Sequence, residues 1–382
     1  MTLFEADREL RRAMNARTRQ VIHRGAFAAT ATLWARPGDL VQRDDAPPQH
    51  ETAIAALGRS WLTPNELFFV RSHHPEPTID LTRWRLDVGG LVHRPFAFPL
   101  DALRTLGHDE AVHTLECAGN GRALAQPQGA NGIPWTHGAV GTALWGGVRL
   151  GEVLGVAGVR PEARHVWFEG ADRPRDPEAP RFVRSLPIEK AMDDVLLAHS
   201  MNGRPLPAAH GAPLRAIVPG WYGMASTKWL TAIRLEREPA PGHYMTTAYR
   251  YAYTVRDRVV ETPVDEVRVK SLITCPLDGA RVRRGHLHAR GFAWGGAGGI
   301  AGIELTCDGG RIWTPGHLLG DSPLHAWRAW EAWIELRHAG RAAIGARAFD
   351  ASGVAQPLRA RSNPGGYGNN SVHRVMVEVA GS

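Results

Sequence analysis

The chain of 382 residues is 43 % hydrophobic and 22 % charged, a balance typical of soluble globular proteins, and it is long enough for about two domains. It contains no run of 18 apolar residues, which excludes a membrane-spanning helix. The formal net charge of +7 is spread along the chain without a nucleic-acid-binding motif, so it favours small anions over nucleic acid as ligands.

Residues 1–60 are predicted to form an N-terminal extension and a linker. The extension is rich in arginine and then weakly apolar from Gly25 to Trp34. Threonines interrupt the apolar stretch and no clean twin-arginine motif adjoins it, so a cytoplasmic protein is favoured over an exported or periplasmic one. Residues 36–52 are rich in proline and charge, which is typical of a linker.

Residues 61–263 have the mixed pattern of an α+β domain. A short helix is predicted over 99–106, with Asp101 near its start. Apolar alternation predicts a strand at residues 84–92, and short apolar runs predict strands at 67–77, 165–172 and 214–220. Residues 228–239 close this region.

Residues 264–382 show a different pattern, with short strands at regular spacing separated by glycine turns. Strands are predicted within 280–294, 302–313, 332–338 and 341–353, and Asp308-Gly309-Gly310 predicts a hairpin turn. This pattern indicates an immunoglobulin-like β-sandwich.

Two patterns in this second region could mislead. Residues 296–301 match the glycine fingerprint of dinucleotide sites, but a strand-type run follows where that fingerprint needs a helix. Trp327, Trp330 and Trp333 recur every third residue, as on one helical face. Because they stand among strands, we interpret them as core or interface aromatics.

Cys117 stands at the start of a glycine- and asparagine-rich turn, "CAGNGR". The chain has only two other cysteines, Cys275 and Cys307, and their spacing fits neither a disulfide framework nor a zinc site. The residues themselves leave three interpretations open, namely a small buried hydrophobe, a nucleophile and a single thiolate ligand to a soft metal.

Five motifs occur in order, "FFVRSH", "TLECAGNGR", "FEGAD", "MNGRPLPAAHGAPLR" and "VPGWYGMASTKWL". Together they resemble the sulfite oxidase family of molybdenum enzymes, from about Trp61 to the C-terminus. The resemblance implies a molybdenum cofactor (molybdopterin) domain followed by a dimerisation domain, and hence a homodimer. It makes Cys117 the molybdenum ligand beside a pyranopterin dithiolene. The cofactor-binding residues it implies are Phe69, Arg71, His73, Asp172, His210, Arg215, Ser226, Thr227 and Lys228.

The resemblance also implies a small-oxyanion pocket, formed by Arg71, Arg122, Trp135 and Tyr249. The chain departs from the family at two positions: Ala248 replaces an acid, and Gly365 stands where a further arginine is expected. The pocket is therefore predicted to lack one positive charge, and an arginine introduced at Gly365 is expected to tighten sulfite binding.

The implied reaction is oxidation of sulfite to sulfate by oxygen-atom transfer. The electrons would pass to an external acceptor such as a cytochrome, because the sequence has no CxxCH motif and no fused haem domain is expected. An oxotransferase that reduces a sulfoxide, nitrate or another oxyanion is the alternative, which the missing arginine favours and which His73 and Tyr249 argue against. A non-enzymatic binding protein of the same fold is the third possibility.

Overall fold

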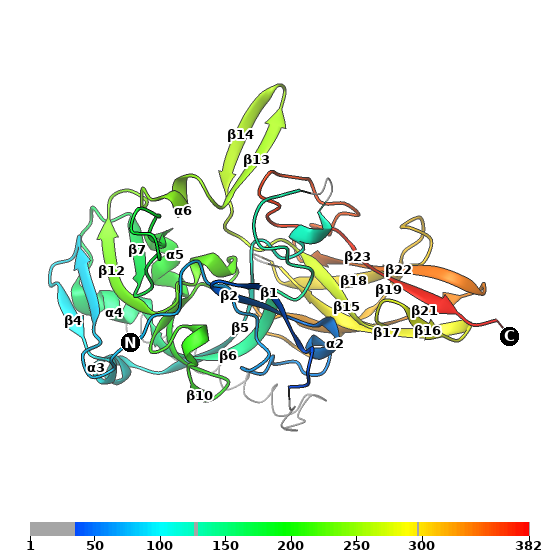
Figure 1. Ribbon diagram of the computed structural model, residues 1–382, viewed down its shortest axis with the longest axis horizontal. Coiled ribbons are helices and arrows are strands. Elements are labelled where there is room, and N and C mark those ends of the chain that lie inside the picture. The colour runs from blue at the N-terminus through cyan, green and yellow to red at the C-terminus, as the bar shows by residue number, and fades with distance from the viewer. Residues whose placement is uncertain (1–34, 126–128, 296–297, 382) are drawn as a thin grey trace.

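The computed structural model describes residues 35–125, 129–295 and 298–381, and it places two halves side by side (Figure 1). The expectations for the N-terminal extension, including its bearing on localisation, concern residues 1–34 and lie outside the described residues. Within the described ranges no helix is long and apolar enough to cross a membrane.

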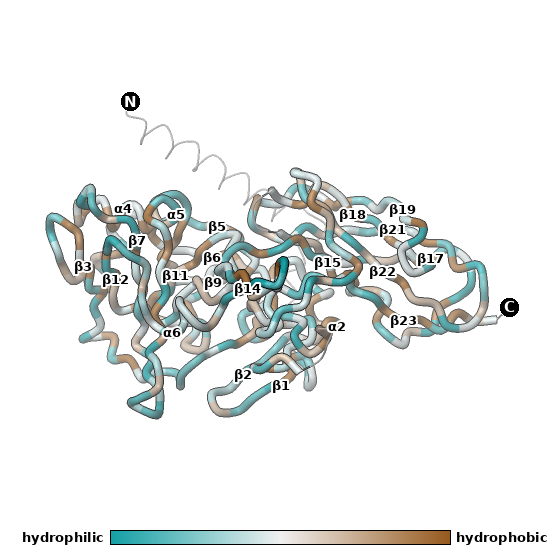
Figure 2. The backbone as a smooth tube through the Cα atoms, turned by 90° about the horizontal axis from the view of Figure 1, so that it is seen from above, coloured by the Kyte–Doolittle hydropathy of each residue, from teal (hydrophilic) through white to brown (hydrophobic). Residues whose placement is uncertain are grey.

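Residues 40–52 form a β-hairpin, so their interpretation as a linker was wrong. Strand β1 (Leu40–Asp45) pairs with β2 (Pro48–Thr52), and in Figure 2 this hairpin lies along one side of the molecule's middle. The Thr52 amide donates to the Gly138 carbonyl at 3.0 Å, and a Cβ at Gly138 would lie 1.8 Å from the Thr52 carbonyl oxygen. Glycine at 138 therefore allows the hairpin to pack directly on the N-terminal half.

Two five-stranded sheets form the N-terminal half. The first has the order β10-β9-β6-β5, with β11 also paired to β9. Its strands are β5 (Asp109–Glu116), β6 (Val140–Arg149), β9 (Leu196–Met201), β10 (Arg204–Pro205) and β11 (Arg215–Ile217). The second has the order β4-β3-β12-β7-β8, in which only β3 and β12 are parallel. Its strands are β3 (Leu86–Gly90), β4 (Phe96–Phe98), β7 (His165–Gly170), β8 (Val183–Pro187) and β12 (Leu230–Glu236).

The helices of this half are short. They are α2 (Ile54–Leu57), α3 (Leu100–Leu106), α4 (Leu150–Ala157), α5 (Ile188–Asp193) and α6 (His243–Thr246), with 3-10 turns η1 (Arg122–Leu124), η2 (Ala208–His210) and η3 (Gly223–Ala225). The predicted helix at 99–106 is confirmed as α3. The predicted strand at 67–77 is wrong, because only Val70 forms a bridge, to His50. Phe68 and Phe69 bury their side chains in the core without joining a sheet.

The C-terminal half is a sandwich of two sheets, which confirms the predicted α+β domain followed by a β-sandwich. One sheet has the order β15-β17-β21-β20, and the other β16-β23-β22-β18-β19. The strands are β15 (Lys270–Cys275), β16 (Ala280–Val282), β17 (Gly285–Trp294), β18 (Ile300–Thr306), β19 (Thr314–Pro315), β20 (His317–Leu319), β21 (Arg328–Leu336), β22 (Gly340–Asp350) and β23 (His373–Val379).

Local features of the sandwich agree with its sequence pattern. Strand β18 begins at Ile300, so a strand and no helix follows the glycine-rich run, whose Gly296 and Ala297 lie outside the described residues. Asp308 accepts backbone N–H bonds in the loop that joins the paired strands β18 and β19. Trp327 and Trp330 are fully buried, whereas Trp333 is 55 % exposed and stacks on His288.

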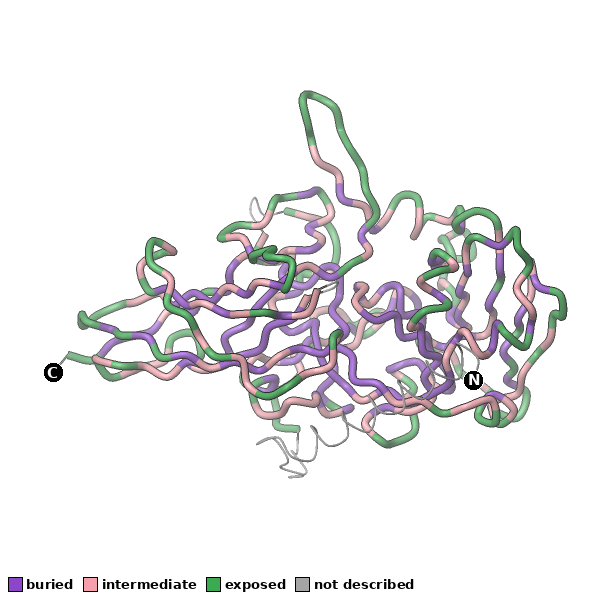
Figure 3. The backbone as a smooth tube through the Cα atoms, turned by 180° about the vertical axis from the view of Figure 1, so that it is seen from behind, coloured by how far each residue is buried: buried purple, intermediate pink, exposed green. Residues whose placement is uncertain are grey.

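A two-stranded hairpin, β13 (Arg250–Val255) and β14 (Arg258–Pro263), projects from the junction of the two halves (Figure 1). Every residue of β14 is exposed, and Figure 3 shows the arm standing clear of the buried interior. The arm begins directly after Tyr249, which is itself buried. The base of the arm is thus joined to the interior site described next.

Candidate active site

Cys117 follows the last residue of β5, at the start of a turn that backbone hydrogen bonds define closely. The Cys117 amide donates to the Ala139 carbonyl at 2.9 Å, and the Asn120 amide donates back to the Cys117 carbonyl at 2.9 Å. Gly121 has φ +88°, and a Cβ at Gly119 would lie 2.5 Å from the Arg122 guanidinium. The glycines therefore allow the chain to reverse and Arg122 to fold back over the turn.

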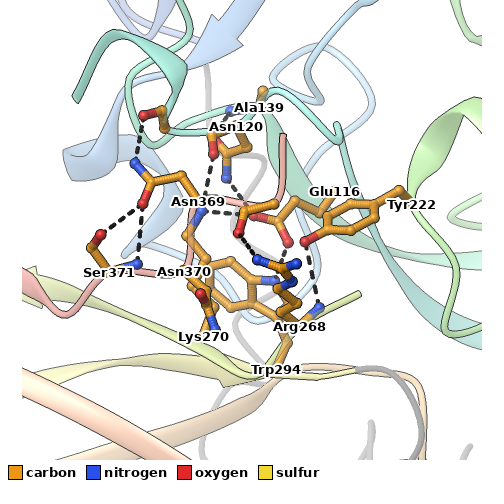
Figure 4. A network of polar contacts seen from close by, with 12 residues as sticks. Glu116, Asn120, Ala139, Tyr222, Arg268, Lys270, Trp294, Asn369, Asn370 and Ser371 are labelled. Atoms are coloured by element: carbon orange, nitrogen blue, oxygen red, sulfur yellow. Dashed lines mark hydrogen bonds and ion pairs between the residues drawn. The ribbon is translucent and has the colours of Figure 1, made fainter. Parts of the chain in front are cut away.

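A buried ion pair joins this turn to the sandwich (Figure 4). Lys270 of β15 donates to Glu116 Oε1 at 2.8 Å, and both side chains are at most 5 % exposed. The same carboxylate accepts from Asn120 Nδ2 at 2.9 Å and from Trp294 Nε1 at 2.9 Å. Because Glu116 immediately precedes Cys117, the sandwich contributes directly to the position of the thiol.

A pocket opens around Cys117, with about 710 Å³ of empty space, part of it open to solvent. Burial raises the pKa of the Cys117 thiol, and the positive charges of Arg71 and Arg122 act in the opposite direction. Ten of the predicted site residues line the pocket: Phe69, Arg71, His73, Cys117, Asp172, His210, Arg215, Ser226, Lys228 and Tyr249.

One side of the pocket carries buried cations held by backbone carbonyls. Arg215 donates to the carbonyls of His210 at 2.9 Å and Ser226 at 3.0 Å. Lys228 donates to Ser72 Oγ at 2.6 Å and to the Ala209 carbonyl at 2.9 Å. Burial lowers the pKa of Arg215 to about 9 and that of Lys228 well below its usual range. These groups lie in a region where an anion would compensate their charge.

Asp172 is the one acidic side chain that lines the described pocket. Burial raises the pKa of this carboxyl to about 6, against the opposing charge of Lys228. Asp172 therefore titrates near neutral pH and can accept hydrogen bonds from N–H groups of a ligand. The Thr227 hydroxyl is buried without a hydrogen-bond partner in the described structure, although Thr227 does not line the pocket.

Aromatic side chains also line the pocket. His73 Nε2 and the Tyr249 hydroxyl share a hydrogen bond of 2.6 Å, and the His73 ring stacks on Phe182 at 4.1 Å. Burial lowers the pKa of His73 well below its usual range and raises that of Tyr249 above its usual range, so both are neutral at pH 7. Tyr249 has φ +57°, a backbone strain that a non-glycine residue tolerates only where its surroundings impose it.

Arg122 lies beside the pocket and does not line it. Its Nε donates to the Gly365 carbonyl at 2.9 Å, its Nη1 donates to the Ile133 carbonyl at 3.0 Å, and its guanidinium lies 5.2 Å from the centre of the Tyr367 ring. A Cβ at Gly365 would lie 2.3 Å from that ring. Tyr367 therefore fills the space that a longer side chain at Gly365 would enter, and we no longer expect an arginine there to tighten binding.

Several outcomes could not be foreseen from the motifs. Trp135 is fully buried in the cluster that contains Cys117 and does not line the pocket. Ser72 and Phe182 do line it. Ser72 lies between Arg71 and His73 in "VRSHH", two residues that were predicted to bind the cofactor. Its position next to them could have suggested that it also lines the site.

Comparison with known proteins agrees with this geometry. Residues 73–244 match the oxidoreductase molybdopterin binding domain, and residues 261–380 match the Mo-co oxidoreductase dimerisation domain. Sulfite oxidase of Arabidopsis thaliana is 32 % identical over 88 % of this chain and 93 % of its own length. The chain belongs to the sulfite oxidase family.

Two further relatives refine this assignment. Mitochondrial sulfite oxidase of Rattus norvegicus is 36 % identical over 85 % of this chain, which spans 62 % of that protein's length. The crystal structure of the sulfane dehydrogenase SoxCD from Paracoccus pantotrophus superimposes with a TM-score of 0.78 at 29 % identity, over 91 % of this chain and 87 % of the other. Both the sequence matches and the structural match therefore support the assignment of this chain to a family of oxidoreductases.

The residues present fit the molybdenum cofactor of this family. A thiol supplies the soft ligand that such a metal prefers. The buried cations Arg215 and Lys228 suit an anionic phosphate, and the Asp172 carboxyl suits a pterin that donates N–H bonds. The donors come from separate segments that converge on one pocket, as a large polar cofactor requires.

Proposed function

We propose that this protein oxidises sulfite to sulfate at the pocket that contains Cys117. The observation that carries the proposal is that one pocket combines this thiol, the cation Arg71 and the hydrogen-bonded pair His73–Tyr249. Sulfite and water become sulfate, two protons and two electrons. The molybdenum–pyranopterin group, when bound, supplies the two-electron redox and oxygen-atom-transfer chemistry.

Cys117 would hold the metal, and Asp172, His210, Arg215, Ser226 and Lys228 would hold the rest of the cofactor. The chain's other contribution is to bind and orient the oxyanion. Arg71 lines the pocket and provides charge-assisted hydrogen bonds that suit a small dianion, and Arg122, which lies beside the pocket, adds positive charge. Tyr249 keeps its proton because burial raises its pKa, so its hydroxyl can donate to an anionic oxygen.

Trp135 is proposed to act indirectly. It is fully buried, and its carbonyl accepts from the Ala123 amide at 3.0 Å, just after Arg122. Its bulk therefore supports the turn that carries Arg122. Thr227 is proposed to serve the cofactor through its unpartnered hydroxyl after a small rearrangement of the loop.

The electrons are proposed to leave for an external acceptor such as a small cytochrome, and the protein is proposed to act as a homodimer through residues 261–380. Support for the dimer is the match to the dimerisation domain. Support for the external acceptor is the lack of a CxxCH motif in the sequence. Size-exclusion chromatography with light scattering tests the first, and the absorbance of the purified protein in the Soret region tests the second.

A second candidate is oxidation of a sulfur substrate that carries less negative charge than sulfite. Tyr367 in place of a cation beside Arg122 favours it, and the resemblance to a sulfane dehydrogenase is consistent with it. A substrate panel separates the candidates, using molybdenum-loaded protein and an artificial acceptor. Sulfite should give the highest kcat/KM, and a preference for an uncharged sulfane compound such as a dialkyl trisulfide would replace the first proposal with the second.

A further inference from the structure

Arg184 is a buried cation close to the pocket that no motif singled out. Arg184 lies on β8, and the residue is only 4 % exposed. Its Nη1 donates to the Tyr244 carbonyl, and its Nε is buried without a hydrogen-bond partner in the described structure. A backbone carbonyl carries only a partial charge, so these contacts leave the guanidinium charge uncompensated.

No acidic side chain in the described part of the chain forms an ion pair with Arg184. Asp265 attracts it from a greater distance, more weakly than burial disfavours the charge. Burial lowers the pKa of Arg184 to about 10, so the guanidinium is still charged at neutral pH. Buried charges in proteins are ordinarily paired, and an unpaired one points to a partner supplied from outside the chain.

The position of Arg184 shows where such a partner would be. Its guanidinium carbon lies 5.4 Å from the centre of the Tyr249 ring, and Tyr249 lines the pocket. Phe182, two residues before it, also lines the pocket and stacks on His73. Because alternate residues of an extended chain face the same side, Arg184 is directed toward the aromatic wall of the pocket.

Arg122 lies at the other end of the same aromatic wall. Its guanidinium is 5.2 Å from the Tyr367 ring, which in turn lies 5.2 Å from the Tyr249 ring. Two cations thus flank a pair of tyrosines, and the space at Gly365 is taken by Tyr367. Besides Arg71, which lines the pocket, the positive field of the substrate side therefore includes charges placed behind the rings.

We propose that Arg184 is a specificity-determining residue, whose charge acts through the Tyr249 ring to hold an anionic substrate or product in the pocket. The inference rests on the proposed function for the identity of the anion, a sulfur oxyanion. It assigns no proton or electron transfer to Arg184. Its charge favours bound anion in the ground state and the transition state alike, so it acts on KM more than on kcat.

The test compares Arg184→Gln, which keeps a donor for the Tyr244 carbonyl but removes the charge, with Arg184→Lys, which keeps the charge. Arg181→Gln is the matched control, because Arg181 is exposed and paired with Glu169. Each molybdenum-loaded variant is titrated with sulfate by calorimetry, and sulfite kinetics are measured across a salt series. Circular dichroism and molybdenum content establish that each variant is folded and loaded.

Arg184→Gln should weaken sulfate binding and raise the KM for sulfite about tenfold, the scale of one charge acting across an interior of effective dielectric constant about 20. Its kcat should stay close to that of the parent, and Arg184→Lys and Arg181→Gln should bind sulfate much as the parent does. Unchanged sulfate binding in folded Arg184→Gln would overturn the inference. If Arg184→Gln does not fold, a folded Arg184→Lys that has lost sulfate binding would overturn it equally.

Failure of the proposed function gives a different result. A parent protein that binds sulfate through Arg184 but does not oxidise sulfite would contradict the sulfite assignment and leave the anion-binding role in place. A loaded parent protein that binds no sulfate at all would overturn the role of Arg184.

Discussion

Replacing Lys270 by methionine should destabilise the protein and loosen the turn that carries Cys117. Lys270 and Glu116 are separated by 2.8 Å and are 5 % and 2 % exposed, so the substitution leaves a carboxylate buried without its cation. Breaking a buried pair in this way typically costs about 3–5 kcal/mol. Asn120 and Trp294 still donate to the carboxylate, so we expect the free energy of unfolding to fall by about 3 kcal/mol.

Urea unfolding of the parent and the variant measures this loss. Lys190→Met is the matched control, because Lys190 pairs with Asp194 at the same distance of 2.8 Å in a more exposed setting. That control should lose about 1 kcal/mol or less. The double variant Glu116→Gln/Lys270→Met should be more stable than the sum of the single variants predicts, since it buries no unpaired charge.

The same substitution should reduce the molybdenum content, because Glu116 is bonded to Cys117, the proposed metal ligand. The Lys190→Met control should retain molybdenum at the parent level. An unchanged unfolding midpoint and unchanged metal content in Lys270→Met would refute the idea that the sandwich positions the Cys117 turn.

Four further predictions concern the pocket. Cys117→Ser should keep the circular dichroism spectrum of the parent and lose sulfite oxidation, because a harder oxygen ligand replaces the thiolate; full turnover would remove Cys117 from the metal site. Arg122→Met should raise the KM for sulfite about tenfold, because it removes a positive charge that lies beside the pocket, with molybdenum content unchanged. Gly365→Arg should destabilise the protein by about 1–3 kcal/mol in thermal unfolding, because its Cβ meets the Tyr367 ring, and Tyr367→Ala should restore part of that loss. Burial raises the pKa of Asp172 in the folded protein to about 6, from its ordinary 3.8, so the carboxyl stabilises the fold below pH 4 and this contribution is lost as pH rises through 6. In urea unfolding of the cofactor-free protein, Asp172→Asn should therefore be more stable than the parent at pH 7 and about as stable at pH 4.

Much of the fold was predictable because it depends on local patterns. The alternation in residues 84–92 and the regular glycine turns after residue 264 each reflect a strand with one buried face, and both predictions are confirmed. The turn at Cys117 was also recognisable, because its glycines serve close approaches that only glycine permits. Local sequence carries this information without reference to distant contacts.

The errors arose where tertiary contacts decide the structure. Residues 40–52 look like a linker, yet Arg43 pairs with Glu51 across the hairpin and stabilises it. Phe68 and Phe69 look like strand residues, yet they fill the core beside a loop. In both stretches, the partner that determines the conformation is distant in sequence or lies across a turn.

The site was predictable in part for the same reason. Cys117, Arg71 and Tyr249 belong to recognisable motifs, and the structure brings them together in one pocket. Arg184 stands in "FVRSLP", where an arginine in an alternating strand is ordinarily an exposed residue. Its burial against Tyr249 depends on the packing of β8 against a segment 65 residues away, which no local pattern encodes.

The most direct test of the proposed function is the yield of sulfate from sulfite by purified, molybdenum-loaded protein with an artificial acceptor. The account predicts one sulfate for every two electrons accepted, from a sample that carries about one molybdenum per chain, and no such yield from Cys117→Ser. Full molybdenum loading without sulfite-dependent reduction of the acceptor would contradict it.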